Sequence, residues 1–154
     1  DDTGATLHDR LARLGAELLE QELPALLDGT LLAEPQAETG ACHAPRISKS
    51  DGKIDWHGSA EDIDRRIRAF NPWPVAQTTV AGEQLRCWMS GLIPGADAAA
   101  AEPGAVLGVS GAALEVQTGA GRVLLHSVQL PGRKPVSGEQ FANAHNLQSL
   151  VLGK

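Results

Sequence analysis

The side chains best suited to chemistry in this 154-residue sequence are two cysteines and five histidines. Cys42 and His43 are neighbours, and a thiol nucleophile needs a base within hydrogen-bond reach. Adjacent residues rarely point at each other, and no Asn or Asp partner for the histidine is identifiable, so we interpret the pair as an incidental part of a linker. Neither cysteine has a second cysteine nearby, and the histidines are scattered, which argues against a metal site. The sequence therefore predicts no catalytic residue and no metal ligand.

Glycine-rich loops that cradle phosphates are also not found in the sequence. Gly119-Ala120-Gly121 comes nearest to such a loop, but it falls between two predicted strands rather than before a helix. This position is typical of a turn. No cofactor-binding residue is predicted.

Basic residues gather in three places. If they hold an RNA or DNA backbone, the affinity comes from the release of counterions. The alternative is ordinary solvated charges, several of them paired with Asp51, Asp62 or Asp64, and charge alone favours this alternative. The three groups are Arg46, Lys49 and Lys53 at the end of a linker, Arg65, Arg66 and Arg68 in a helix, and Arg133 with Lys134 after the strands.

The net charge of −6 is unevenly distributed. Residues 1–38 carry nine acidic and two basic side chains, whereas residues 39–154 carry ten acidic and eleven basic ones. The acidity therefore belongs to the first segment. The remainder is close to neutral and has room for a local basic face.

Three tryptophans offer either stacking platforms for bases or bulk for a core. They are Trp56, Trp73 and Trp88. Pro72 and Pro74 flank Trp73 and fix the backbone on either side of it. We interpret Trp73 as a structural wedge between a helix and the β-rich body.

A leucine stripe predicts a long first helix. Leucines recur at helical spacing from Leu7 to Leu27, Thr6-Leu7-His8-Asp9 resembles a capping box, and Gly29 supplies a stop. Pro24 predicts either a kink or the start of a second helix. The stripe must be buried, and no other helix of similar size follows, so we expect its partner to lie outside this chain.

Short strands separated by glycine-containing turns make up most of the remaining sequence. Residues 32–50 show no period and predict a linker, and Ser59 with Asp62 predicts the start of a second helix that ends before Pro72. An alanine-rich loop is expected at residues 96–102, and Ser137 caps a last short helix. The pattern predicts a mainly β fold with α-helices, as a small barrel or sandwich. The expected strands are Gln77–Val80, Gln84–Ile93, Ala105–Val109, Ala113–Thr118 and Arg122–Leu130.

The sequence also indicates the cellular compartment in which we expect the protein. It has no apolar run of about 18 residues or more, so we expect no membrane partner. Its first residues show no signal-peptide pattern and no initiator Met, and we interpret the chain as a piece of something longer. The two cysteines do not form the framework of a secreted domain, which favours reduced thiols and the cytoplasm.

Three stretches of the sequence resemble parts of one known protein family. "PRISKSDGKIDWHGSAEDIDRRIRAFNPWPVA", Pro45–Ala76, resembles the start of the C-terminal domain of the methionyl-tRNA formyltransferase family. "TLHDRLARLGAELLEQELPALLDGT" resembles the last helical segment of its catalytic domain, and "GRKPVSGEQF" resembles a motif near its C-terminus. The resemblance covers nearly the whole chain in the expected order. The C-terminal "QFANAHNLQSLVLGK" departs from the pattern because it has few bases.

The resemblance implies a small open Greek-key, OB-like barrel with short helices, preceded by a helix left from a Rossmann-like formyltransferase domain. Residues 1–33 would be the C-terminal helical segment of the catalytic domain, 34–47 a linker and 48–154 the barrel domain. The missing N-terminal catalytic domain would bind 10-formyl-tetrahydrofolate as co-substrate and formylate the amino group of Met on initiator tRNA. This chain would carry no cofactor and be inactive alone.

For this chain the resemblance implies a role in holding the initiator Met-tRNA through backbone contacts. The residues that match are Arg46, Lys49, Lys53, Arg133 and Lys134. A structural or interaction module of a related formyltransferase, of the sugar-nucleotide or formyl-tetrahydrofolate hydrolase type, is the alternative.

Overall fold

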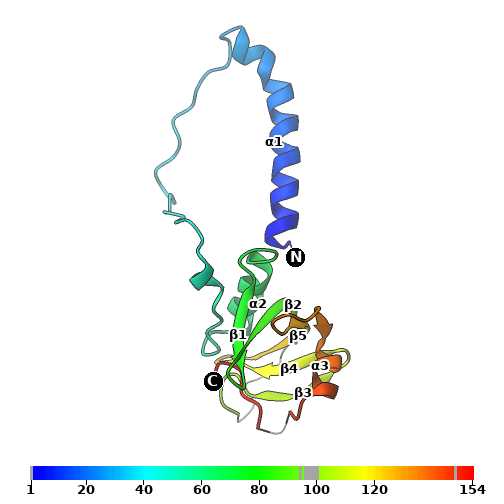
Figure 1. The fold of residues 1–154 in the computed structure, drawn as a ribbon. Coiled ribbons are helices and arrows are strands. Elements are labelled where there is room, and N and C mark those ends of the chain that lie inside the picture. The colour runs from blue at the N-terminus through cyan, green and yellow to red at the C-terminus, as the bar shows by residue number, and fades with distance from the viewer. Residues whose placement is uncertain (1, 94, 96–100, 148) are drawn as a thin grey trace.

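One antiparallel sheet organises the fold of this computed structural model, which describes residues 2–93, 95, 101–147 and 149–154. The mainly β fold class predicted from the sequence is confirmed. The predicted alanine-rich loop lies largely outside the described residues. In chain order the elements are α1 (Gly4–Leu27), the 3₁₀ helix η1 (Lys49–Gly52), α2 (Ala60–Ala69), β1 (Ala76–Val80), β2 (Glu83–Leu92), β3 (Val106–Ser110), β4 (Ala113–Gln117), β5 (Arg122–Gln129), β6 (Val136–Ser137) and α3 (Gly138–Ala144), as Figure 1 shows.

The six strands follow the order β1-β2-β5-β4-β3, with β6 also paired to β5. The turn between β1 and β2 is Ala81-Gly82, whose φ angles are 49° and 81°. Two consecutive positive φ angles are typical of the tight hairpin turn that matches the twist of the strands. β1 and β2 therefore form a hairpin with a turn of two residues.

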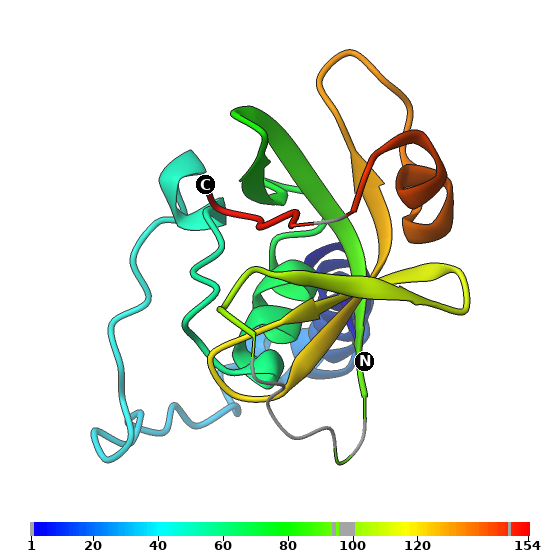
Figure 2. The same cartoon turned by 90° about the horizontal axis from the view of Figure 1, so that it is seen from below.

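The C-terminal segment joins the two end strands of the sheet. The Leu152 amide donates to the Gly104 carbonyl just before β3, at 2.8 Å, and the Gly153 amide donates to the Thr79 carbonyl of β1, also at 2.8 Å. The Leu152 side chain is 2% exposed and packs in the core. The tail thus links the edges that the strand order leaves apart (Figure 2). The OB-like designation stays a prediction.

Helices α2 and α3 supply the rest of the core. Ser59 caps α2 by accepting from the Asp62 amide at 3.1 Å, and Ser137 caps α3 by accepting from the Gln140 amide at 3.1 Å. Both predicted caps are confirmed. The buried core comes from both helices and four strands, and includes Ile63, Ile67, Leu85, Cys87, Leu114, Val116, Val123, Leu125, Val128 and Phe141.

Helix α1 differs from its prediction in two ways. It begins at Gly4, because Thr3 is the N-cap and shares a reciprocal capping box with Thr6, so the predicted box of Thr6 with Asp9 is wrong. The Ala5 amide also donates to the Asn71 carbonyl at 3.0 Å, which fixes the start of α1 against the end of α2. Pro24 lies inside the single helix, so no second helix begins there. Within the described residues, no helix combines the length and hydropathy needed to cross a bilayer.

Two of the three tryptophans lie in opposite surroundings. Trp56 is 4% exposed, and its Nε1 donates to the Thr78 Oγ1 at 2.9 Å inside the core. Trp73 is 55% exposed, so its predicted role as a wedge is wrong. The peptide bonds before Pro72 and Pro74 are both cis. The corner that these prolines form presents Trp73 to the surface rather than to the core.

Candidate nucleic-acid interface

A row of polar side chains crosses three neighbouring strands. Gln77 of β1 lies opposite Arg86 of β2, and Arg86 lies opposite Gln129 of β5. Residues that face each other on paired strands share one side of the sheet, with about 5 Å between adjacent strands. Beyond the row, the Gln129 Nε2 donates to the Arg133 carbonyl at 2.7 Å. The row therefore runs from β1 to the loop that contains Arg133.

The 3₁₀ helix η1 brings Lys49 to the other end of this row. The Ser48 amide donates to the Asp51 carboxylate at 2.7 Å, and the Ser48 hydroxyl donates to the same oxygen at 2.9 Å. These two hydrogen bonds stabilise the charged form and hold the pKa of Asp51 below its ordinary value. Directly after η1, the Ile54 amide donates to the Gln77 carbonyl at 2.8 Å. The end of the linker is thus fastened to β1.

The corner between α2 and β1 is fastened to β2. The Asn71 Nδ2 donates to the Trp88 carbonyl at 2.8 Å, and the Val75 amide donates to the Phe70 carbonyl at 2.9 Å. The Trp88 Nε1 in turn donates to the Gln129 Oε1 at 2.8 Å. These bonds place Trp73 beside the polar row.

A groove of about 410 Å³ lies between η1, the corner and the row. Lys49 and Arg86 supply its two positive charges, and Trp73 and Trp88 supply its aromatic surfaces. No acidic side chain lines the groove among the residues that the structure describes. An anion that enters the groove therefore meets only attractive charges.

The basic residues divide into paired and unpaired groups. On α2, Arg65 pairs with Asp62 at 2.9 Å and Arg68 pairs with Asp64 at 2.9 Å, while the Arg66 guanidinium donates to the Asp51 carbonyl at 2.6 Å. The alternative of structural ion pairing thus holds for this helix. Over the described part of the chain, no ion pair engages the exposed cations Arg46, Lys49, Lys53, Arg86, Arg133 and Lys134.

The predicted site residues lie at several places on the surface. Lys49 lines the groove, Lys53 bridges to Gln77 of β1, and Arg133 with Lys134 lies exposed in the loop between β5 and β6. Arg46 lies exposed in the linker just before η1. Arg86 was missed from the sequence, although the alternation of Gln84, Arg86 and Trp88 along β2 indicated a common face.

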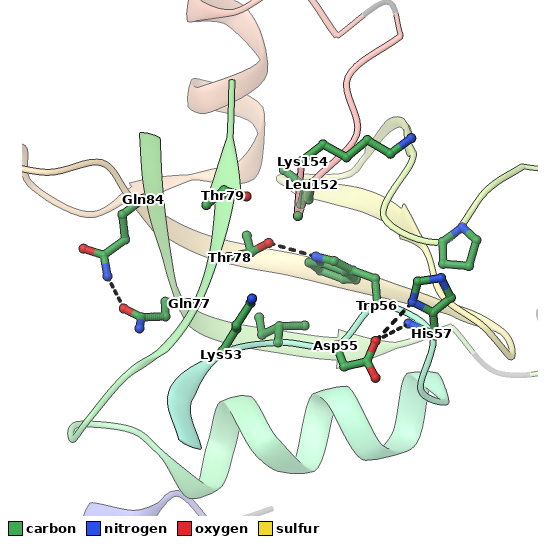
Figure 3. A pocket seen from close by; sticks show the side chains of 13 residues that line it. Lys53, Asp55, Trp56, His57, Gln77, Thr78, Thr79, Gln84, Leu152 and Lys154 are labelled. Carbon is green, nitrogen blue, oxygen red and sulfur yellow. Dashed lines mark hydrogen bonds and ion pairs between the residues drawn. The ribbon is translucent and has the colours of Figure 1, made fainter. Parts of the chain in front are cut away.

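A larger hollow of about 740 Å³ lies on the other side of Gln77, where Lys53, Trp56 and Lys154 line it (Figure 3). Most of the charged side chains that line this hollow form ion pairs within the chain. The His57 Nδ1 lies 3.2 Å from the Asp55 carboxylate, and the Lys154 Nζ lies 2.6 Å from the Glu102 carboxylate. The His57 amide also donates to Asp55, which is the main reason that the pKa of Asp55 lies below its ordinary value. The smaller groove is therefore the better site for an anion.

The cysteines and histidines form neither a disulfide nor a metal-ion cluster within the described residues. Cys42 is exposed and Cys87 is buried, and both are free thiols. Burial raises the pKa of Cys87 to about 12, so this thiol stays protonated and inert. No cluster of three or more His, Cys, Asp or Glu side chains suited to a metal ion occurs in this part of the chain.

Comparison with known protein families identifies the family of the chain that carries this surface. The family model described as the formyl transferase C-terminal domain matches residues 46–146. This chain belongs to that family. The match contains η1, α2, the sheet and α3, and so every residue of the polar row. The sequence resemblance to formyltransferases is confirmed.

Several known relatives are similar to this chain over nearly its whole length. A methionyl-tRNA formyltransferase of Nitrosococcus oceani is 45% identical over 155 residues, covering 99% of this chain and 47% of the relative. Those of Methylococcus capsulatus and Coxiella burnetii are 44% and 38% identical, covering 99% and 100% of this chain and 49% and 48% of each relative. The chain spans about half the length of these curated relatives.

Solved structures show the same fold at lower identity. A variant of HypX from Aquifex aeolicus aligns with a TM-score of 0.61 at 18% identity, covering 83% of this chain and 22% of that one. HypX in complex with tetrahydrofolic acid aligns with a TM-score of 0.59 at 18% identity, covering 82% of this chain and 22% of that one. At this identity the likeness extends to the fold alone.

Proposed function

We propose that this chain is the C-terminal part of a methionyl-tRNA formyltransferase. Its residues 48–154, here called the sheet domain, hold the tRNA through contacts with its phosphates. The observation that carries the proposal is the division of the cations: those on α2 bond to acidic side chains or a backbone carbonyl, whereas the six cations named above are exposed and form no ion pair within the described residues. An exposed cation without an acidic partner is available to a phosphate. The contacting residues are Arg46, Lys49, Lys53, Arg86, Arg133 and Lys134.

Phosphate contacts supply affinity rather than sequence recognition. Each phosphate that a lysine or arginine neutralises releases condensed counterions, so binding weakens as salt rises. Holding the tRNA beside a separate active site also removes part of the entropic barrier of a reaction between two molecules. The sheet domain acts on the reaction by positioning, without touching the reacting atoms.

The parent enzyme divides into parts that extend beyond this chain. Residues 1–33 are the last helical segment of its catalytic domain, 34–47 a linker and 48–154 the tRNA-binding domain. The preceding catalytic domain takes 10-formyl-tetrahydrofolate as co-substrate and formylates the methionine amino group of initiator Met-tRNA. The enzyme works in the cytoplasm, in keeping with two free thiols. This chain alone has no transferase activity.

The test is the salt dependence of tRNA binding by the 154-residue chain. Replacing Lys49, Arg133 and Lys134 together by Ala removes three phosphate contacts. The affinity for initiator tRNA at low salt should fall by roughly 10-fold or more, and the slope of log affinity against log salt should fall by about 3. Fluorescence anisotropy with labelled tRNA over a salt series measures both quantities.

A matched variant separates this effect from a loss of net charge. Arg10, Arg13 and Arg65 replaced together by Ala remove the same number of charges from α1 and α2, and should leave both quantities nearly unchanged. If the two triple variants bind alike, or if the unaltered chain does not bind tRNA at low salt, the domain is a structural module instead.

A further inference from the structure

We propose that the groove between η1 and β2 binds one unpaired nucleotide of an RNA, with its base stacked on Trp73 and its phosphate held by Lys49 and Arg86. This inference rests on the proposed function and adds a subsite to it. Phosphate contacts along the row need no aromatic side chain. Two tryptophans that line a groove beside the row therefore point to a second kind of contact.

The exposure of Trp73 is the first step. Trp73 is 55% exposed although it lies in a corner fastened on both sides, by Asn71 to β2 and by Val75 to the end of α2. The prolines on each side limit the backbone, so little conformational freedom is lost when a base packs against the ring. Every base has a π-face, and stacking on an aromatic side chain is a general means of holding single-stranded nucleic acid.

The shape and charge of the groove are the second step. A volume of about 410 Å³ lies in the range of small-ligand sites. Trp88 forms a further wall, and its position is set by the bond from its Nε1 to Gln129. Lys49 and Arg86 line the same groove and have no acidic partner within the described residues. An aromatic surface beside two cations matches a nucleotide, which offers a π-face and a phosphate together.

The preference for an unpaired nucleotide is the third step. In a helix the faces of a base are covered by its neighbours, so only a loop, a bulge or an end can present a base for stacking. A duplex can still reach the cations through its phosphates. Single-stranded and double-stranded RNA should therefore respond differently to loss of the ring.

The experiment uses the 154-residue chain with a short single-stranded RNA that contains 2-aminopurine, and with a duplex of the same length. Trp73→Ala should weaken binding of the single strand by about 5- to 100-fold and remove the quenching of 2-aminopurine fluorescence. Binding of the duplex should change by less than about 2-fold, because only phosphates contact the protein there. Trp73→Phe should retain most of the quenching. Arg86→Ala should weaken both RNAs and lower the salt slope by about 1.

Met89→Ala is the matched control, because Met89 is 57% exposed on β2 and does not line the groove. It should bind both RNAs as the unaltered chain does. Equal affinity and equal quenching for Trp73→Ala and Met89→Ala would overturn the proposal, as would an equal loss for the single strand and the duplex. If loss of Lys49, Arg133 and Lys134 weakens tRNA binding while Trp73→Ala has no effect, the proposed function stands and this subsite fails.

Discussion

Gly52 ends η1 directly against the backbone of the corner. A Cβ at this position would lie 2.7 Å from the Val75 carbonyl oxygen and 3.4 Å from the Pro74 Cγ. Val75 itself has a φ of 70°, a conformation that a β-branched residue rarely adopts, so this part of the corner has little room to yield. The absence of a side chain at Gly52 is what allows Lys49 to reach the groove.

Gly52→Ala should therefore impair binding without changing any charge. The methyl group must push η1 away from Val75, at a cost of about 1–3 kcal/mol in the free energy of unfolding. Lys49 moves with η1, so the salt slope of tRNA binding should fall by about 1. Chemical denaturation and anisotropy measure the two effects.

Gly15→Ala is the matched control for this substitution. Gly15 lies in α1 with nothing within 4 Å of an added Cβ, and Ala favours a helix over Gly by about 1 kcal/mol. Binding should be unchanged. A Gly52→Ala chain with unaltered affinity and salt slope would mean that Lys49 makes no phosphate contact.

At the scale of elements, one network joins α1, α2 and β2. Asp64 is 6% exposed, accepts from the Ser90 hydroxyl at 2.7 Å and pairs with Arg68 at 2.9 Å. The Arg68 Nη1 also donates to the Asp2 carbonyl at 3.1 Å. A buried carboxylate is costly without its partner, so Arg68 serves both the sheet domain and the attachment of α1.

Arg68→Ala should lower the free energy of unfolding by about 2 kcal/mol, because it leaves the Asp64 carboxylate buried without its cation. It should also loosen the start of α1, seen as faster proteolysis between α1 and η1. Arg65→Ala on the same helix removes an exposed pair and should cost less than about 1 kcal/mol. Equal stability of the two variants would show that the Asp64 network does not hold α2 to the sheet.

The same comparison of elements shows what sequence reasoning can reach. The Ser59 and Ser137 caps and the Ala81-Gly82 turn follow from signals within a few residues, and all were predictable. Arg86 lies opposite Gln77 and Gln129 only because three strands pair in a particular register. A local sequence pattern does not predict this register. The tryptophans illustrate the same limit: a bulky ring fits a core or a surface equally well until the corner that carries it is built.

At the scale of the whole molecule, α1 projects away from the sheet domain, and the linker returns along a separate path (Figure 1). None of the residues of α1 is buried. The leucines of α1 are 39–76% exposed, and that their partner lies outside this chain stays a prediction. These exposed leucines are Leu7, Leu11, Leu14, Leu18, Leu19, Leu23, Leu26 and Leu27.

A contiguous apolar helix face of this kind favours association between copies, since complete burial of one leucine contributes about 1.5–3 kcal/mol. The 154-residue chain should therefore associate as its concentration rises, which sedimentation velocity measures. Replacing Leu11, Leu14 and Leu18 by Gln should shift the chain to a monomer and abolish binding of a hydrophobic dye. Replacing Arg13, Glu17 and Glu20 by Gln, on the same helix, should leave association unchanged. A chain that stays monomeric at every concentration and binds no dye would mean that the α1 leucines are covered in solution by another part of the same molecule.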